Sequence, residues 1–186
     1  MSDPFLEVTG VKTEADAMRE SLKSTLQQRQ NKVYARNEAG NERTAFRSEL
    51  ARFIREESQN YAQPNQPISD IQHCETIRRI SDTLSHRFGN ILKGGRMRYG
   101  TSQKALNLYL KFLWRLGKVA VPPHCPVDSN VLEAAGISGS RTWSDSEKEY
   151  MGWIDSFRRK AGTRSLAEWE YAVWLTSVKQ DSRTSC

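Results

Sequence analysis

The sequence predicts an all-α, multi-helix protein. No segment of any length alternates apolar and polar residues with the period of two that a half-buried strand requires. Apolar residues instead recur three and four positions apart, in segments separated by glycine, proline and cap residues. A chain of 186 residues is long enough for one domain, or for one domain with a helical N-terminal extension.

Residues 1–62 are predicted to form that N-terminal helical extension. A first helix, capped by Thr13 and acidic in its first turn, runs to about residue 33. Its thin apolar stripe suits docking onto the main body or onto a partner protein. The stripe consists of Ala15, Met18, Leu22 and Leu26. A second helix covers about residues 44–59, and the proline-containing segment 63–67 ends the extension.

The main domain is expected over residues 63–180. Ser69 caps a helix over 70–88, and the glycine-rich segment 89–100 follows it. Thr101 or Ser102 can cap a long apolar helix that ends near residue 117. The proline-rich stretch 121–126 is expected to be extended.

The C-terminal part of the main domain contains three further helices. They start near Asp128, Ser144 and Ser165, because each of these side chains can cap a helix. Residues 181–186 are expected to form a disordered tail.

The bulk properties predict a cytoplasmic protein. No apolar run approaches the roughly 20 residues that span a bilayer, and the polar start of the chain does not resemble a signal peptide. Three cysteines without framework spacing indicate reduced thiols. The pairs His73-Cys74 and His124-Cys125 could in principle supply zinc ligands. However, adjacent helical residues point about 100° apart, so no metal site is expected.

Positive charge is concentrated in one segment. Between residues 78 and 118, ten basic residues stand against one acid, so this segment carries +9 while the whole chain carries +6 and the remainder −3. Concentrated positive charge attracts polyanions and speeds their capture, so DNA is the expected partner. The residues expected to contact phosphates are Arg78, Arg79, Arg87, Lys93, Arg96, Arg98, Lys111 and Arg115.

The long apolar helix is predicted to be buried, and its polar positions share one side. These positions are Lys104, Asn107, Lys111 and Arg115. We interpret the stripe as facing a cleft or the protein surface. A solvent-exposed edge of the helix, along which the lysine and arginine stems lie, would also explain it. Lys104 lies in the first turn of the predicted helix, where the helix dipole would lower the pKa of its amine. A deprotonated lysine is a nucleophile that forms Schiff bases.

Two segments carry a recognisable pattern. The first is Tyr99-Gly-Thr-Ser-Gln-Lys104-Ala-Leu-Asn-Leu-Tyr-Leu, and the second is Pro126-Val-Asp128-Ser-Asn-Val-Leu. Over about 40 of the 186 residues they resemble the core of the helix-hairpin-helix DNA glycosylases, and most closely the smaller 8-oxoguanine glycosylases. The turn before Lys104 lacks that family's Leu-Pro-Gly-Val-Gly signature. The resemblance implies that Lys104 attacks the sugar C1′ and that Asp128 activates it or stabilises charge. A cap role alone also explains an aspartate at position 128.

Three functions remain open from the sequence. The first is a base-excision glycosylase that needs no cofactor and acts through Lys104 and Asp128. The second is a non-catalytic helical nucleic-acid-binding protein that uses the same basic segment. The third is a protein-interaction factor, for example of a phage or mobile element, whose positive charge meets an acidic protein. A glycosylase requires Lys104 and Asp128 to face one cavity, whereas a binding protein requires only the basic surface.

Overall fold

The computed structural model describes residues 3–27, 33–35, 40–62, 66–138 and 145–184. These residues form eight α-helices and two short 3-10 helices, with one isolated bridge between Tyr34 and Leu92 and no strand. The prediction of an all-α fold is confirmed. In chain order, the elements are α1 (Pro4–Thr9), α2 (Glu14–Leu26), α3 (Gly40–Ser58), η1 (Gln59–Tyr61), α4 (Asp70–Phe88), η2 (Lys93–Gly95), α5 (Tyr99–Arg115), α6 (Ser129–Ala134), α7 (Glu147–Ala161) and α8 (Leu166–Thr184).

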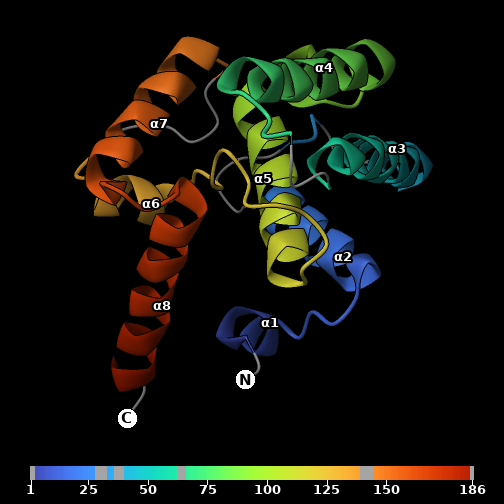
Figure 1. Cartoon of the computed structure of the whole chain (residues 1–186). Coiled ribbons are helices and arrows are strands. Elements are labelled where there is room, and N and C mark those ends of the chain that lie inside the picture. Colours follow the sequence, from blue (N-terminus) through green and yellow to red (C-terminus); the bar gives the residue numbers. More distant parts are fainter. Residues whose placement is uncertain (1–2, 28–32, 36–39, 63–65, 139–144, 185–186) are drawn as a thin grey trace.

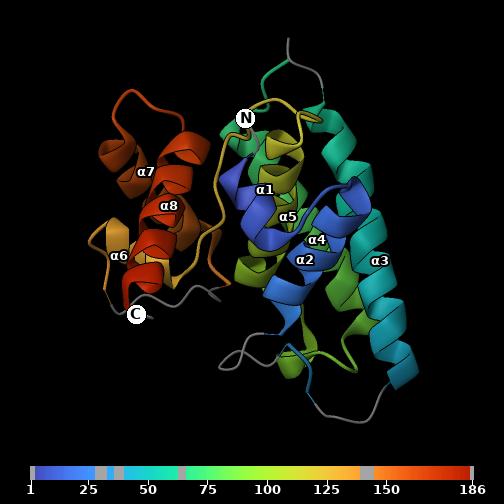
Figure 2. The same cartoon turned by 90° about the horizontal axis from the view of Figure 1, so that it is seen from below.

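The helices gather into two groups that lie on either side of the chain segment 118–127 (Figures 1 and 2). The first group is α1 to α5, in which α5 packs against each of the other four helices. The second group is α6 to α8, in which α8 packs against both α6 and α7. No helix within the described residues is long and apolar enough to cross a bilayer.

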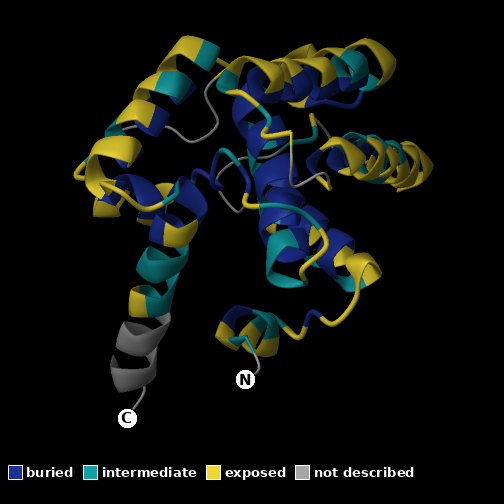
Figure 3. Cartoon of the chain, viewed as in Figure 1, coloured by how far each residue is buried: buried dark blue, intermediate teal, exposed yellow. Residues whose placement is uncertain are grey.

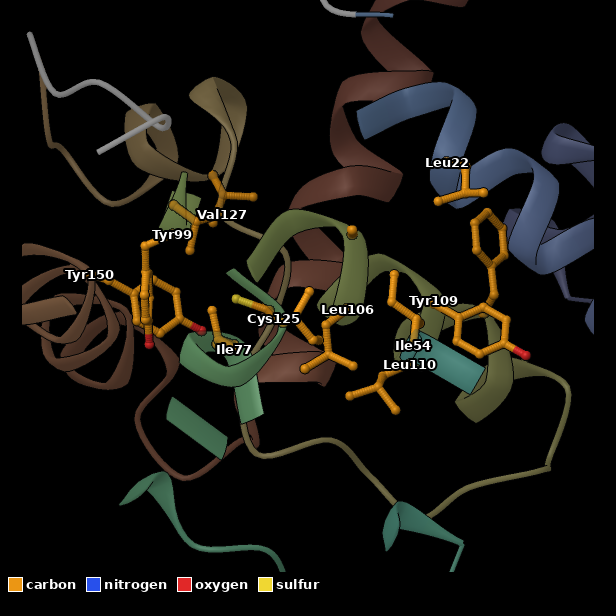
Figure 4. Packing of buried hydrophobic residues seen from close by; sticks show 14 of the residues in the cluster. Leu22, Ile54, Ile77, Tyr99, Leu106, Tyr109, Leu110, Cys125, Val127 and Tyr150 are labelled. Carbon is orange, nitrogen blue, oxygen red and sulfur yellow. The ribbon is translucent and has the colours of Figure 1, made fainter. Parts of the chain in front are cut away.

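The helix α5 is the buried centre of the structure, as its sequence predicts. Figure 3 shows it as a dark blue column between the other helices. Apolar side chains cover most of its circumference, so neighbours can pack around it on several sides. Figure 4 shows Leu106 and Leu110 of α5 in one cluster with Leu22, Ile54 and Ile77, which come from α2, α3 and α4.

The N-terminal third belongs to this same core. Leu22 of α2 and Phe46 of α3 are buried in the cluster that contains α5, and the Phe5 ring of α1 stacks on Phe112 with centroids 4.7 Å apart. The predicted extension over residues 1–62 is therefore integrated in the main body. The sequence analysis did not predict α1. Its local signals are Asp3 as N-cap, Pro4 at the first helical position and Gly10 with a φ of 68° at the C-cap.

The ends of two helices differ from the prediction. The helix α5 begins at Tyr99, before both predicted cap residues, so Lys104 lies in its second turn. The helix α8 continues to Thr184, so it includes residues 181–184 of the predicted tail over 181–186. Residues 185–186 lie outside the described part of the chain.

The turn between α4 and α5 is held closely against the end of α4. A Cβ atom on Gly89 would lie 2.8 Å from the carbonyl oxygen of Gly95, so this approach requires glycine. The Ser85 hydroxyl accepts a hydrogen bond from the backbone N–H of Met97 (2.9 Å). On the other side of the turn, the backbone N–H of Lys93 donates to the carbonyl of Val33 (2.8 Å). These contacts define the direction in which α5 leaves the turn.

The central position of α5 predicts that truncating one of its buried side chains destabilises the protein. We expect Leu113→Ala to lower the free energy of unfolding by about 2–5 kcal/mol, because Leu113 is 3% exposed and its loss leaves a cavity. Ile71→Ala on α4 is the control, because Ile71 is 72% exposed and should cost less than about 0.5 kcal/mol. Urea unfolding of both variants measures the difference. Equal losses would contradict the central position of α5.

Candidate functional site

Most of the basic residues in the segment 78–118 are neutralised by acids from outside it. Seven of its ten cations are ion-paired in the structure, which explains why a segment of +9 can lie in a chain whose remainder is −3. The pairs are Arg78–Glu147 (2.6 Å), Arg79–Glu57 (2.8 Å), Arg87–Glu49, Arg96–Asp145 (3.7 Å), Lys111–Glu170 (2.8 Å), Arg115–Asp3 and Lys118–Glu14 (3.8 Å). The segment is therefore not one unpaired basic face.

Lys111 is buried and cannot contact a phosphate. Its ammonium lies 2.8 Å from the carboxylate of Glu170, and both side chains are almost inaccessible to water, with 4% and 6% exposure. Its Nζ also lies 4.2 Å from the ring centroid of Phe5, which adds a cation–π contact. Burial raises the pKa of Glu170, whereas the charge of Lys111 opposes that shift. The assignment of Lys111 to a phosphate-binding surface is wrong, because the fold turns it towards α8.

Unpaired positive charge gathers at and after the turn between α4 and α5. Within the segment 78–118, all of which the structure describes, Lys93, Arg98 and Lys104 have no ion-pair partner, and Arg96 has only the long contact to Asp145. Lys93 and Arg96 are exposed, while Arg98 and Lys104 are half-buried. This turn is the part of the predicted basic surface whose cations are available to a polyanion.

Lys104 and Asp128 are close enough for their charges to interact. Burial lowers the pKa of the Lys104 amine, and the negative charge of Asp128 opposes part of this shift. The cause is burial rather than the helix end, because Lys104 lies in the second turn of α5. Asp128 caps α6 as predicted, since its carboxylate accepts a hydrogen bond from the backbone N–H of Val131 (3.1 Å).

The middle of the polar stripe of α5 faces the interior of the molecule, because Asn107 and Lys111 are buried, whereas Lys104 and Arg115 at its two ends are half-buried. Asn107 is fully buried, and its side-chain amide donates to the carbonyl of Cys125 (3.0 Å) and to the hydroxyl of Tyr150 (3.1 Å). Its carbonyl oxygen lies 2.8 Å from Nε2 of His73. Since an amide oxygen can only accept, this nitrogen must carry the proton. Asn107 thus connects α5 to α4, to α7 and to the extended segment before α6.

The two His-Cys pairs noted in the sequence meet in the structure, but they form hydrogen bonds to other side chains. The rings of His73 and His124 lie 4.5 Å apart. Nδ1 of His73 accepts from the hydroxyl of Tyr61 (2.7 Å), and Nδ1 of His124 accepts from that of Tyr150 (2.8 Å). Nε2 of His124 donates to Asp70 (3.1 Å). Within the described residues, no group of three or more His, Cys, Asp or Glu side chains is arranged to hold a metal ion.

These residues form a continuous hydrogen-bonded network, buried except at its end at Asp70, which we call the polar seam. It consists of Tyr61, Asp70, His73, Asn107, His124 and Tyr150. Its donors and acceptors match when both histidines are neutral. In agreement, burial lowers the pKa of His73 well below its ordinary value and that of His124 to about 4. The sequence analysis missed the seam, and the repeated His-Cys pair was its only visible signal.

Two surface cavities adjoin the seam at Tyr61. One is lined by η1, Gln66–Ile68 and α4, and the other by Tyr61, Gln66–Ile68, Ala120, Val121 and Pro123. Neither has Lys104 or Asp128 in its lining.

Scans against protein-family models, curated proteins and solved structures each find no match for this chain. Functional inference therefore depends on the geometry and on the two segments around Lys104 and Asp128.

The seam predicts a loss of stability in mild acid. Unfolded histidines titrate near pH 6.5, so between pH 6.5 and 4 the unfolded chain binds more protons than the folded one. The free energy of unfolding should fall by about 1–2 kcal/mol from pH 6.5 to 5 through His124 alone. His124→Gln should reduce this fall, and His86→Gln, at an exposed position, should leave it unchanged. Urea unfolding at several pH values measures it, and equal pH dependence in all three proteins would contradict the assignment.

Proposed function

We propose that this chain binds DNA and acts on a damaged nucleotide through Lys104, with Asp128 as the charged partner of that lysine. The observation that carries the proposal is the state of Lys104 itself. It is a half-buried amine with a lowered pKa, it has no ion-pair partner among the described residues, and it lies within electrostatic reach of a carboxylate. Most other cations of the basic segment are held in ion pairs, and such cations cannot act as nucleophiles.

The chemistry follows from the neutral amine. A lysine whose pKa is lowered by burial is deprotonated in a larger fraction of molecules at neutral pH. Nζ of Lys104 would attack C1′ of the sugar, the bond from C1′ to the base would break, and the base would leave with the proton that Nζ releases. Opening of the C1′–O4′ bond, with a proton taken up by O4′, would then form a protonated Schiff base.

Asp128 would stabilise the positive charge that develops on the sugar and on the Schiff base. Its carboxylate is held by the hydrogen bond from Val131, so it needs little reorganisation during the reaction. The same negative charge keeps part of the Lys104 population protonated, so the two residues together set the fraction of reactive amine.

DNA contact is proposed for the turn between α4 and α5. Lys93 and Arg96 are exposed there and Arg98 is half-buried, and all three precede by six residues or fewer the first residue of the helix that carries Lys104. Phosphates bound at this turn would bring the sugar-phosphate backbone towards Lys104. The same available cations favour the alternative function, which is nucleic-acid binding without chemistry.

Borohydride trapping tests the catalytic proposal. On duplex DNA that contains an abasic site or 8-oxoguanine, the wild-type protein should give a covalent adduct, because borohydride reduces the Schiff base to a stable amine. Lys104→Gln should lose the adduct. The matched control is Lys160→Gln, which removes an exposed lysine of α7, outside the proposed DNA-binding turn, and should keep the adduct. No adduct on either DNA, with retained binding in a mobility-shift assay, would favour the alternative function. An adduct that persists in Lys104→Gln would exclude Lys104 as the nucleophile.

Asp128→Asn separates the cap role from a catalytic one. Asparagine caps helices about as well as aspartate, so the melting temperature should change by less than about 2 °C. It carries no negative charge, so base release should be lost while DNA binding persists. Asp128→Ala is the comparison, because it removes the cap as well and should cost about 1 kcal/mol. Full activity in Asp128→Asn would show that Asp128 is a cap alone.

A further inference from the structure

Gln103 directly precedes Lys104 on α5, and its side chain is fully buried. Its amide nitrogen donates a hydrogen bond to the backbone carbonyl of Val127 (3.1 Å). Its amide oxygen accepts one from the backbone N–H of the same residue (3.2 Å). Val127 immediately precedes Asp128, so this pair of bonds holds the backbone one residue before the carboxylate.

A second amide holds the same stretch of chain. Asn107, one turn further along α5, donates to the carbonyl of Cys125 (3.0 Å) and also to the amide oxygen of Gln103 (3.1 Å). Between the two held residues stands Pro126, whose ring restricts the backbone. Hydrogen bonds from these two side chains of α5 to the backbone therefore hold residues 125–127 against the helix.

These bonds span the two groups of helices. Lys104 belongs to α5 in the first group, whereas Asp128 begins α6 in the second (Figure 2). The helix α6 packs against α8, and α5 is not among its main neighbours. The position of Asp128 relative to Lys104 therefore depends on residues 125–127, which Gln103 and Asn107 hold.

We propose that Gln103 is a positioning residue, and that its two hydrogen bonds to Val127 hold the carboxylate of Asp128 within electrostatic reach of the amine of Lys104. The catalytic consequence rests on the proposed function, but the positional claim concerns the free protein. It follows that the effect of the Asp128 charge on the titration of the Lys104 amine requires the amide of Gln103.

The test is a double-mutant cycle on the pKa of Lys104, without DNA. NMR of the reductively 13C-methylated protein reports this pKa, and Lys104→Arg assigns the resonance. Asp128→Asn should lower it, because a favourable negative charge is lost. In Gln103→Met, which keeps the side-chain length but removes both hydrogen bonds, the lowering should shrink to less than half. Ser102→Ala is the matched control. Ser102 is also buried on α5, but its hydroxyl bonds only within its own helix, to the carbonyl of Arg98 (3.2 Å), so the full lowering should remain.

Several results would overturn the proposal. One is an equal lowering in the Gln103→Met and wild-type backgrounds, and another is no lowering in either. Gln103→Asn, whose shorter amide stays polar but cannot make both bonds, repeats the measurement in a second background. Failure of both Gln103 variants to fold, with Ser102→Ala folded, would show that Gln103 serves only the fold. The trapping experiment is independent: a reduced coupling without any adduct would refute the proposed function alone, and an adduct with unchanged coupling would refute the positioning role alone.

Discussion

The two groups of helices are joined across the polar seam, and Asn107 is the side chain on which that seam depends. Its amide bonds to α4, to α7 and to the segment before α6 at the same time. A buried polar network stabilises a unique arrangement only when every member is satisfied, because each unpaired group costs about 1–3 kcal/mol. The relative position of the two groups is therefore tied to a set of matched donors and acceptors, with both histidines neutral.

This constraint explains the unusual composition of α5. Its apolar side chains pack against α2, α3 and α4, where shape and burial suffice, and its amides face the second group of helices. Lys111 extends the same polar side further along the helix, where it reaches Glu170 of α8. A buried ion pair contributes little net stability, but loss of one partner leaves an uncompensated charge. Such a pair favours one register of α8 against α5 over its alternatives.

The surface ion pairs have a different consequence. Arg78, Arg79 and Arg87 of α4 are at least half exposed, so each pair contributes about 0–1 kcal/mol. Their main effect is to determine which cations of the segment 78–118 remain available to a polyanion. With the α4 arginines paired to Glu147, Glu57 and Glu49, the cations of the segment 78–118 that have no ion-pair partner are at the turn before α5 and at Lys104. Ion pairing thus leaves the available cations of the basic segment at the turn before α5 and at Lys104, the half-buried amine on which the proposed function depends.

The sequence by itself determined the local elements of this protein. Periodicity and caps predict the helices, their approximate ends and the central place of α5, because these signals act between residues no more than four positions apart. The cap role of Asp128 was predictable for the same reason. Only the tertiary structure decided which way polar side chains point and which cations stay free. The partners of Asn107 lie 34 and 43 residues away on α4 and α7, and Lys111 finds Glu170 at a separation of 59. The burial of a polar residue depends on partners that the packing of distant helices supplies, and no local pattern records them.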